Sequence, residues 1–166
     1  MVTPAREYDV AADRNDAAPV CANGKTPLSI ARDWMDAAAR CDLKAIADGM
    51  ADGCKRFGEP DWSVIEKHDY IKAYGQFLTS FSDYRLQIVN VMAKGRTIVF
   101  EMIESATFSH PYRLPDGATI QPNGRTYTDR VCTWVEVDES GKIAEIRAYI
   151  PSNRSRLLAD AARASG

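Results

Sequence analysis

The chain has 166 residues, enough for one domain with a substantial hydrophobic core. Its composition is 45% hydrophobic and 27% charged with a net charge of −2, which is ordinary for a globular protein and argues against a basic nucleic-acid binder. No apolar run approaches the ~20 residues that span a membrane, and the polar start of the chain lacks the apolar core of a signal peptide. We therefore expect a cytoplasmic protein that binds neither nucleic acid nor membrane.

Cysteines and histidines show no metal-binding pattern. The four cysteines are widely and irregularly spaced, the chain has only two histidines, and no C-x-x-C or H-E-x-x-H motif occurs. A Gly-rich phosphate loop and a G-x-S-x-G elbow are also missing. We expect reduced thiols and no metal site. The residues concerned are Cys21, Cys41, Cys54, Cys132, His68 and His110.

The first part of the chain indicates a polar arm followed by helices. Residues 1–25 are rich in Ala, Asp, Asn and Pro without periodicity, which predicts a mobile N-terminal arm. The Thr-Pro pair at residues 26–27 is typical of a helix start, and apolar residues at three- and four-residue spacing continue this helix to residue 40. Asp42 is placed to cap a second, short helix that ends near residue 50.

The rest of the chain predicts one more long helix and then strands. A short strand is expected over residues 54–57, and Ser63 to Glu66 has the pattern of a capping box that begins a helix running to residue 81. Helices followed by strands favour an α+β fold in a single domain, residues 26–166. We expect a curved, antiparallel or mixed sheet wrapped around helices as a cone-shaped α+β barrel with an internal pocket. The four long strands cover residues 84–92, 96–110, 124–137 and 143–150, and a short helix around Leu157 ends the chain.

The two middle strands carry ionisable side chains on a face that is otherwise apolar. By alternation, Glu104 and His110 share the apolar face of the first, and Asp129 shares that of the second. Burying an ionisable group costs free energy unless the group is paired with a partner or serves a function. We predict Glu104 as a general acid or base, and a His110–Asp129 pair, brought together by the hairpin, as a second one. Neutralisation of Glu104 by an arginine and a surface position for His110 are the structural alternatives.

Six more residues are candidate substrate contacts. Arg56 is a candidate for binding a phenolate, enolate or carboxylate, and Tyr74 is a candidate hydrogen-bond donor to a developing oxyanion. The aromatic residues among the six are equally compatible with packing in the hydrophobic core. The Pro/Gly-rich loop over residues 111–123 is either a lid over the pocket or a subunit contact. The six are Arg56, Tyr74, Trp34, Trp62, Met102 and Thr133.

Several short sequence motifs, taken in their order along the chain, resemble the nuclear transport factor 2-like superfamily. Within it they resemble the SnoaL-like branch of polyketide cyclases, limonene-epoxide hydrolases and ketosteroid isomerases. The resemblance covers residues 27–160. It implies a pocket at the open end of a cone, chemistry by carboxylates, His and Tyr without a cofactor, and a homodimer or homotrimer. The motifs are ARCDLKAI at 39–46, MADG at 50–53, GKIAEIRAY at 141–149, and His110 followed by NGR at 123–125.

The chain departs from two of these relatives at residues that carry their chemistry. The ketosteroid isomerases have an aspartic acid where Thr133 stands and a tyrosine where Trp34 stands. The epoxide hydrolases have an Arg-x-Asp pair and a second Asp at the positions of Met102, Glu104 and Ala148, so one carboxylate of the set survives.

Together these features predict a cofactor-independent lyase, cyclase or isomerase. It would act on a small apolar or aromatic molecule by proton abstraction and oxyanion stabilisation. Water addition to an epoxide and a non-catalytic binding or assembly domain are the alternatives.

Overall fold

The structure is a computed structural model that describes residues 19–58, 62–114, 116–151 and 153–164. The predicted mobile arm falls mostly on residues 1–18, which lie outside the described residues. The elements in chain order are α1 (Pro27–Ala39), α2 (Leu43–Gly49), β1 (Met50–Gly58), β2 (Ile65–Glu66), α3 (Lys67–Ser80), β3 (Phe81–Lys94), β4 (Thr97–Phe108), β5 (Tyr112–Arg113), β6 (Thr119–Ile120), β7 (Thr126–Val137), β8 (Ile143–Tyr149) and α4 (Asn153–Ala164).

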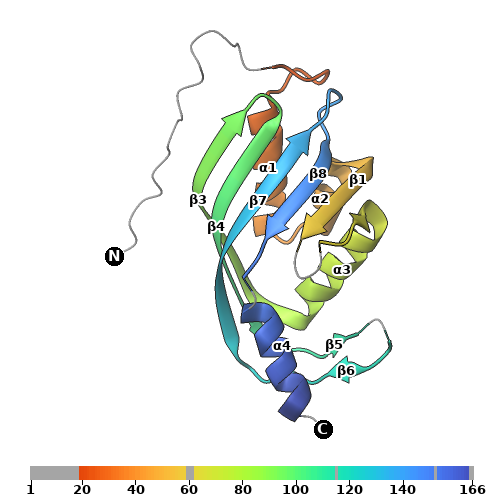
Figure 1. Ribbon diagram of the computed structural model, residues 1–166, viewed down its shortest axis with the longest axis vertical. Coiled ribbons are helices and arrows are strands. Elements are labelled where there is room, and N and C mark those ends of the chain that lie inside the picture. The colour runs from red at the N-terminus through yellow and green to blue at the C-terminus, as the bar shows by residue number, and fades with distance from the viewer. Residues whose placement is uncertain (1–18, 59–61, 115, 152, 165–166) are drawn as a thin grey trace.

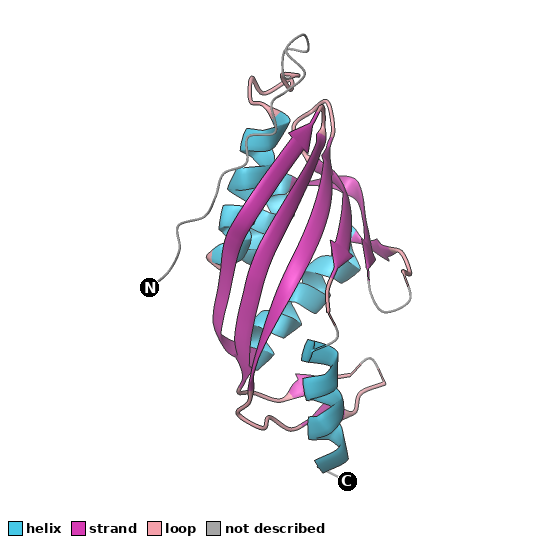
Figure 2. Cartoon of the chain, turned by 60° about the vertical axis from the view of Figure 1, so that its left-hand side comes forward, coloured by secondary structure: helices cyan, strands magenta, loops and turns pink. Residues whose placement is uncertain are grey.

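A curved six-stranded sheet dominates the molecule, with the order β2-β1-β8-β7-β4-β3 (Figure 1). β1 runs parallel to β8 and the other neighbours are antiparallel, so the sheet is mixed. Helices α1, α2 and α3 lie against one face and leave the other uncovered (Figure 2). The predicted α+β fold is therefore confirmed. The sheet is open rather than closed into a barrel, because β2 and β3 at its two edges do not pair.

Helix α1 forms where the sequence predicts it. Its Thr26 cap accepts a hydrogen bond from the Ser29 amide at 3.2 Å, and Pro27 occupies the first turn. The apolar stripe faces the sheet, and each fully buried large side chain contributes about 1.5–3 kcal/mol. The buried stripe consists of Ile30, Ala31, Trp34, Met35 and Ala38. Helix α2 likewise begins at its predicted cap, since Asp42 accepts from the Ala45 amide at 2.9 Å.

The β4–β7 hairpin fixes which side chains face the helices. Its register runs without a bulge from Thr97 opposite Glu136 to Thr107 opposite Thr126. Burial alternates strictly along both strands, as the sequence predicts. In this register Glu104 lies directly opposite Asp129, and both side chains point to the helix side.

Helix α3 and strand β1 differ from their predicted bounds. The capping-box start at Ser63 is wrong, because Ile65 and Glu66 pair with β1 and the helix begins only at Lys67. Ladder bonds to the neighbouring strand hold those two residues extended. Strand β1 runs from Met50 to Gly58, so the predicted strand over residues 54–57 was too short.

The N-terminal residues that are described pack on the domain. Cys21 is buried, and the Ala22 amide donates to the Glu139 carbonyl at 2.9 Å. The packed part of the chain thus begins before residue 26, where the sequence places its boundary. None of the described helices is long and apolar enough to cross a membrane.

The loop after β4 and the last helix build a second layer at one end of the molecule (Figure 1). The predicted loop over 111–123 contains the small β5–β6 hairpin. Helix α4 buries Leu157 and Ala161 against the same cluster of side chains, which includes Phe77 and Phe108.

Candidate functional site

A cavity of about 260 Å³ lies between the helices and the covered face of the sheet. It has room for roughly nine water molecules at ~30 Å³ each, so it suits a small ligand. Side chains from helices α1, α3 and α4 and from strands β1, β2, β3, β4, β5, β7 and β8 line it. Six of the nine residues proposed from the sequence are among the lining: Trp34, Arg56, Tyr74, Met102, Glu104 and Thr133.

Glu104 is the carboxylate of this cavity, and its two oxygens are held differently. Oε1 accepts a hydrogen bond from the Tyr127 hydroxyl at 2.5 Å and lies 3.7 Å from Nη1 of Arg154. Oε2 accepts from the Tyr84 hydroxyl at 3.3 Å, its one hydrogen-bond donor among the described residues. The side chain is 10% exposed. One oxygen is therefore anchored, while the other keeps an unused lone pair and a single long hydrogen bond.

A chain of phenols extends from Glu104 across the cavity. The Tyr74 hydroxyl donates to the Tyr84 hydroxyl at 3.3 Å, and Tyr84 donates onward to Glu104. Burial raises the pKa of Tyr84 and of Tyr127, and the neighbouring Glu104 carboxylate raises both further. Burial also raises the pKa of Tyr74, as does Tyr70 beside it. The phenols therefore stay protonated and act as hydrogen-bond donors.

Arg154 brings a positive charge to the anchored oxygen from helix α4. Burial by itself lowers the pKa of this guanidinium, but Glu104 and then Tyr127 outweigh burial and raise the pKa overall. The guanidinium also lies over the Phe77 ring, 4.9 Å from its centroid. Arg154 thus ties the C-terminal helix to the cavity.

The predicted His110–Asp129 pair is not formed. His110 is exposed beyond the end of β4, and its Nδ1 lies 3.0 Å from the Ser109 hydroxyl. Asp129 sits opposite Glu104, which precedes His110 by six residues, or about 20 Å of extended strand. Alternation placed the histidine on the inner face, but the strand ends at Phe108 before that alternation reaches it.

Asp129 is buried, 1% exposed, yet neither carboxylate oxygen has a hydrogen-bond partner among the described residues. It does not line the cavity.

Trp62, predicted as a substrate contact, does not line the cavity either. The ring is 38% exposed and packs edge-on against Tyr149, with centroids 4.9 Å apart, outside the cavity.

The sequence missed three residues that contact or pair with Glu104, namely Tyr84, Tyr127 and Arg154. For the two tyrosines a signal exists: Tyr84 alternates in phase with Leu86, and Tyr127 with Asp129. No local pattern marks Arg154, since it reaches the site from a helix fifty residues further along the chain than Glu104.

The thiols stay apart from this site. Cys54 is buried on β1, and burial raises its pKa to about 12, so the group is a thiol at neutral pH. No disulfide joins the four cysteines, and no three His, Cys, Asp or Glu side chains of the described residues are placed to hold a metal ion.

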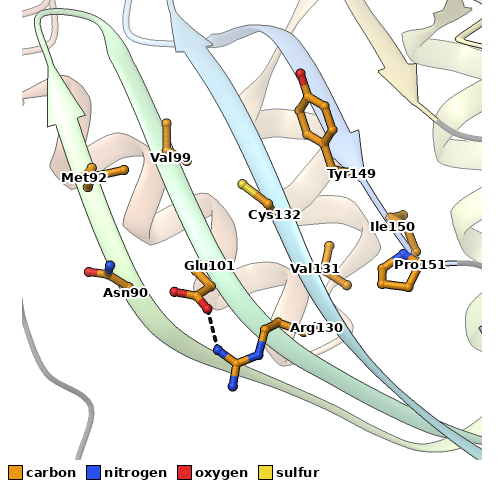
Figure 3. Close-up of a pocket in the computed structure, with 10 residues that line it drawn as sticks. All are labelled: Asn90, Met92, Val99, Glu101, Arg130, Val131, Cys132, Tyr149, Ile150 and Pro151. Atoms are coloured by element: carbon orange, nitrogen blue, oxygen red, sulfur yellow. Dashed lines mark hydrogen bonds and ion pairs between the residues drawn. The ribbon is translucent and has the colours of Figure 1, made fainter.

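A wider hollow of about 580 Å³ lies on the uncovered face of the sheet (Figure 3). Glu101 on β4 and Arg130 on β7 pair there at 2.5 Å, with side chains 37% and 63% exposed. Water screens this pair, so neither Glu101 nor Arg130 is desolvated as Glu104 is. The cavity around Glu104 is therefore the better candidate for chemistry.

Comparison with solved structures supports the fold. A putative SnoaL-like polyketide cyclase from Jannaschia sp. CCS1 superposes with a TM-score of 0.68 at 14% identity, covering 89% of this chain and 96% of that one. AclR, a putative hydroxylase from Streptomyces galilaeus, gives 0.67 at 18% identity and covers 81% of each chain. An LEH-like epoxide hydrolase from M. tuberculosis gives 0.59 at 14% identity, covering 83% and 92%. At these identities the likeness shows the fold alone.

Among curated protein sequences, none matches this chain. The SnoaL-like domain, in contrast, matches residues 31–146, which is well over half of the sequence. That span runs from within α1 to within β8 and contains all of the elements between them. The chain therefore belongs to the SnoaL-like domain family.

Proposed function

We propose that this protein is a cofactor-independent acid/base enzyme, a lyase, cyclase or isomerase, that removes a proton from a small apolar or aromatic molecule. The observation that carries the proposal is the asymmetric environment of Glu104. Tyr127 and Arg154 fix Oε1, so the carboxylate cannot rotate freely. Oε2, in contrast, is held by the long hydrogen bond from Tyr84. Oε2 is the oxygen available to accept a substrate proton.

The phenols supply the second half of the chemistry. When Oε2 takes a proton from carbon next to a carbonyl, negative charge develops on the carbonyl oxygen. Once Oε2 is protonated, Tyr84 no longer has to donate to it, so the Tyr84 hydroxyl can turn to the carbonyl oxygen and stabilise that charge, while it still accepts from Tyr74. Elimination, cyclisation and isomerisation share this enolate step, and a positioned base contributes about 10²–10⁴-fold to it. Polyketide cyclases among the structural neighbours support this reading.

Hydrogen–deuterium exchange at carbon tests the proposal before the natural substrate is known. The protein is incubated in heavy water with a panel of small aromatic ketones, esters and keto acids, and loss of the acidic C–H signal is followed by NMR. We expect catalysed exchange that Glu104→Gln lowers by about 10²–10⁴-fold. Glu101→Gln, which changes an exposed carboxylate of the same strand on the opposite face, serves as the control.

Equal exchange by wild type and Glu104→Gln, or no catalysed exchange with any panel member, would remove the proposal. The competing function is a non-catalytic small-molecule carrier. It is favoured by one observation, that both oxygens of Glu104 already accept hydrogen bonds from the protein. Ligand binding without exchange would identify that function.

We also propose the homodimer or homotrimer that the sequence predicts. The uncovered face of the sheet exposes Trp134 at 39% and Tyr149 at 44%, which is costly for an isolated subunit. The cytoplasmic location stays a prediction of the sequence.

A further inference from the structure

The charges that line the cavity do not balance. Among its described lining residues, three carry a charge at neutral pH: Arg56, Arg154 and Glu104. Glu104 and Arg154 form an ion pair. Two cations against one anion leave the guanidinium of Arg56 as the excess positive charge.

Arg56 has an aromatic neighbour but no anionic one in the described part of the chain. It projects from β1 with its guanidinium carbon 5.8 Å from the centroid of the Tyr70 ring. No described carboxylate forms an ion pair with it. Burial lowers the pKa of this guanidinium and Arg154 lowers it further, which reports the cost of holding a second cation here. A desolvated cation of this kind is stabilised when an anion joins it.

The backbone beside Arg56 leaves room for the guanidinium. A Cβ atom at Gly58 would lie 2.9 Å from Nη2 and 3.0 Å from Nη1 of Arg56. Any side chain at position 58 would therefore push the guanidinium out of its place. The glycine, two residues along the same strand face, keeps the fork of donors where it lines the cavity.

An aromatic wall connects Arg56 with Glu104. Tyr70, over which Arg56 lies, stacks on Tyr74 with ring centroids 5.9 Å apart. Tyr74 in turn reaches Tyr84, the donor to Oε2 of Glu104. The cavity thus has a cationic end at Arg56, a basic end at Glu104 and phenol rings between them.

We propose that Arg56 binds a carboxylate of the ligand, so that the substrate is a small carboxylic acid with an aromatic or apolar body. The planar guanidinium fork matches a carboxylate in two parallel hydrogen bonds. The carboxylate itself does not react; it docks at Arg56 and orients the C–H bond toward Glu104. This inference names the substrate class for the proposed function. The part of it that concerns the C–H bond at Glu104 rests on that function.

Calorimetric titration of the full chain with benzoate and phenylacetate, each beside its neutral amide, tests the inference. Wild type is expected to bind the acids about ten- to a hundredfold more tightly than the amides. Arg56→Met keeps the length of the side chain and should abolish that preference while amide binding stays. Arg56→Lys, which keeps the charge and loses the fork, should retain part of it. Arg147→Met, an exposed arginine on neighbouring β8, is the matched control and should behave as wild type.

Three results would overturn the inference: acids and amides bound equally by wild type, no acid bound at millimolar concentration, or a preference that survives in Arg56→Met. Circular dichroism melting of each variant verifies that it is folded. Glu104→Gln separates this inference from the proposed function, since it removes the base and should leave the preference for acids intact. If Glu104→Gln loses C–H exchange but still prefers acids, the result supports both the proposed function and the role of Arg56. If Glu104→Gln still catalyses exchange, the proposed function is refuted, while the preference for acids continues to support the role of Arg56.

Discussion

Tyr127 is the residue that fixes the orientation of the Glu104 carboxylate. Its ring is 4% exposed, and its hydroxyl donates to Oε1 at 2.5 Å from the strand that pairs with β4. A buried hydrogen bond to a charged acceptor contributes more than a neutral one, because the acceptor left behind is desolvated.

Replacing Tyr127 with Phe should therefore lower the free energy of unfolding by about 2 kcal/mol. Chemical denaturation of the two proteins measures the difference. Tyr149→Phe, at a ring that is 44% exposed, is the control and should stay within about 0.5 kcal/mol of wild type. Equal stability of the two variants would show that the Tyr127 hydroxyl does not support the buried carboxylate.

Helix α4 contributes two side chains to the cavity, Arg154 and Leu158. Arg154 contacts Glu104 and Phe77, whereas β4 and β7 are held together by a continuous hydrogen-bonded ladder. Elements with few buried contacts open locally at lower free energy than a central hairpin does.

Arg154→Met should accordingly increase hydrogen exchange in α4 and in the β5–β6 hairpin beside it, while β4 and β7 keep their protection. Hydrogen-exchange mass spectrometry resolves these segments. Arg156→Met, two positions along the same helix and exposed, is the matched control and should leave the exchange of α4 unchanged. Unchanged exchange in both variants would mean that apolar contacts such as Leu157 hold the helix alone.

At the scale of the whole molecule, the buried phenols connect stability to alkaline pH. Burial raises the pKa of Tyr70 to about 12, against about 10 in an unfolded chain. Between these values the folded state holds a proton that the unfolded state has lost. The contribution of such a group to the free energy of unfolding is therefore fully present below pH ~10. It falls as the pH rises further, by up to about 1.4 kcal/mol per pH unit for each such group.

Alkaline titration should show tyrosinate absorbance from the buried rings appearing together with loss of the circular dichroism signal. Tyr70→Phe removes one such group and should move the unfolding midpoint to higher pH relative to wild type at matched neutral stability. Complete ionisation of the tyrosines in a chain that keeps its folded spectrum would contradict this account.

The sequence by itself determined the elements and the inner face. Thr26, Asp42 and the apolar stripe of α1 are local signals, and the alternation along β4 and β7 placed Glu104 inside, because these depend on neighbours a few residues away. The same local reasoning failed at Ser63, where pairing with β1 overrides a capping pattern.

Only the tertiary structure decided which polar groups meet. It ended β4 before His110, placed Asp129 opposite Glu104, and brought Arg154 to the carboxylate from a distant helix. It also left Arg56 in the cavity without an anion among the described residues. Strand ends, register and helix docking set these distances, and they follow from packing across the whole sheet rather than from any short stretch of sequence.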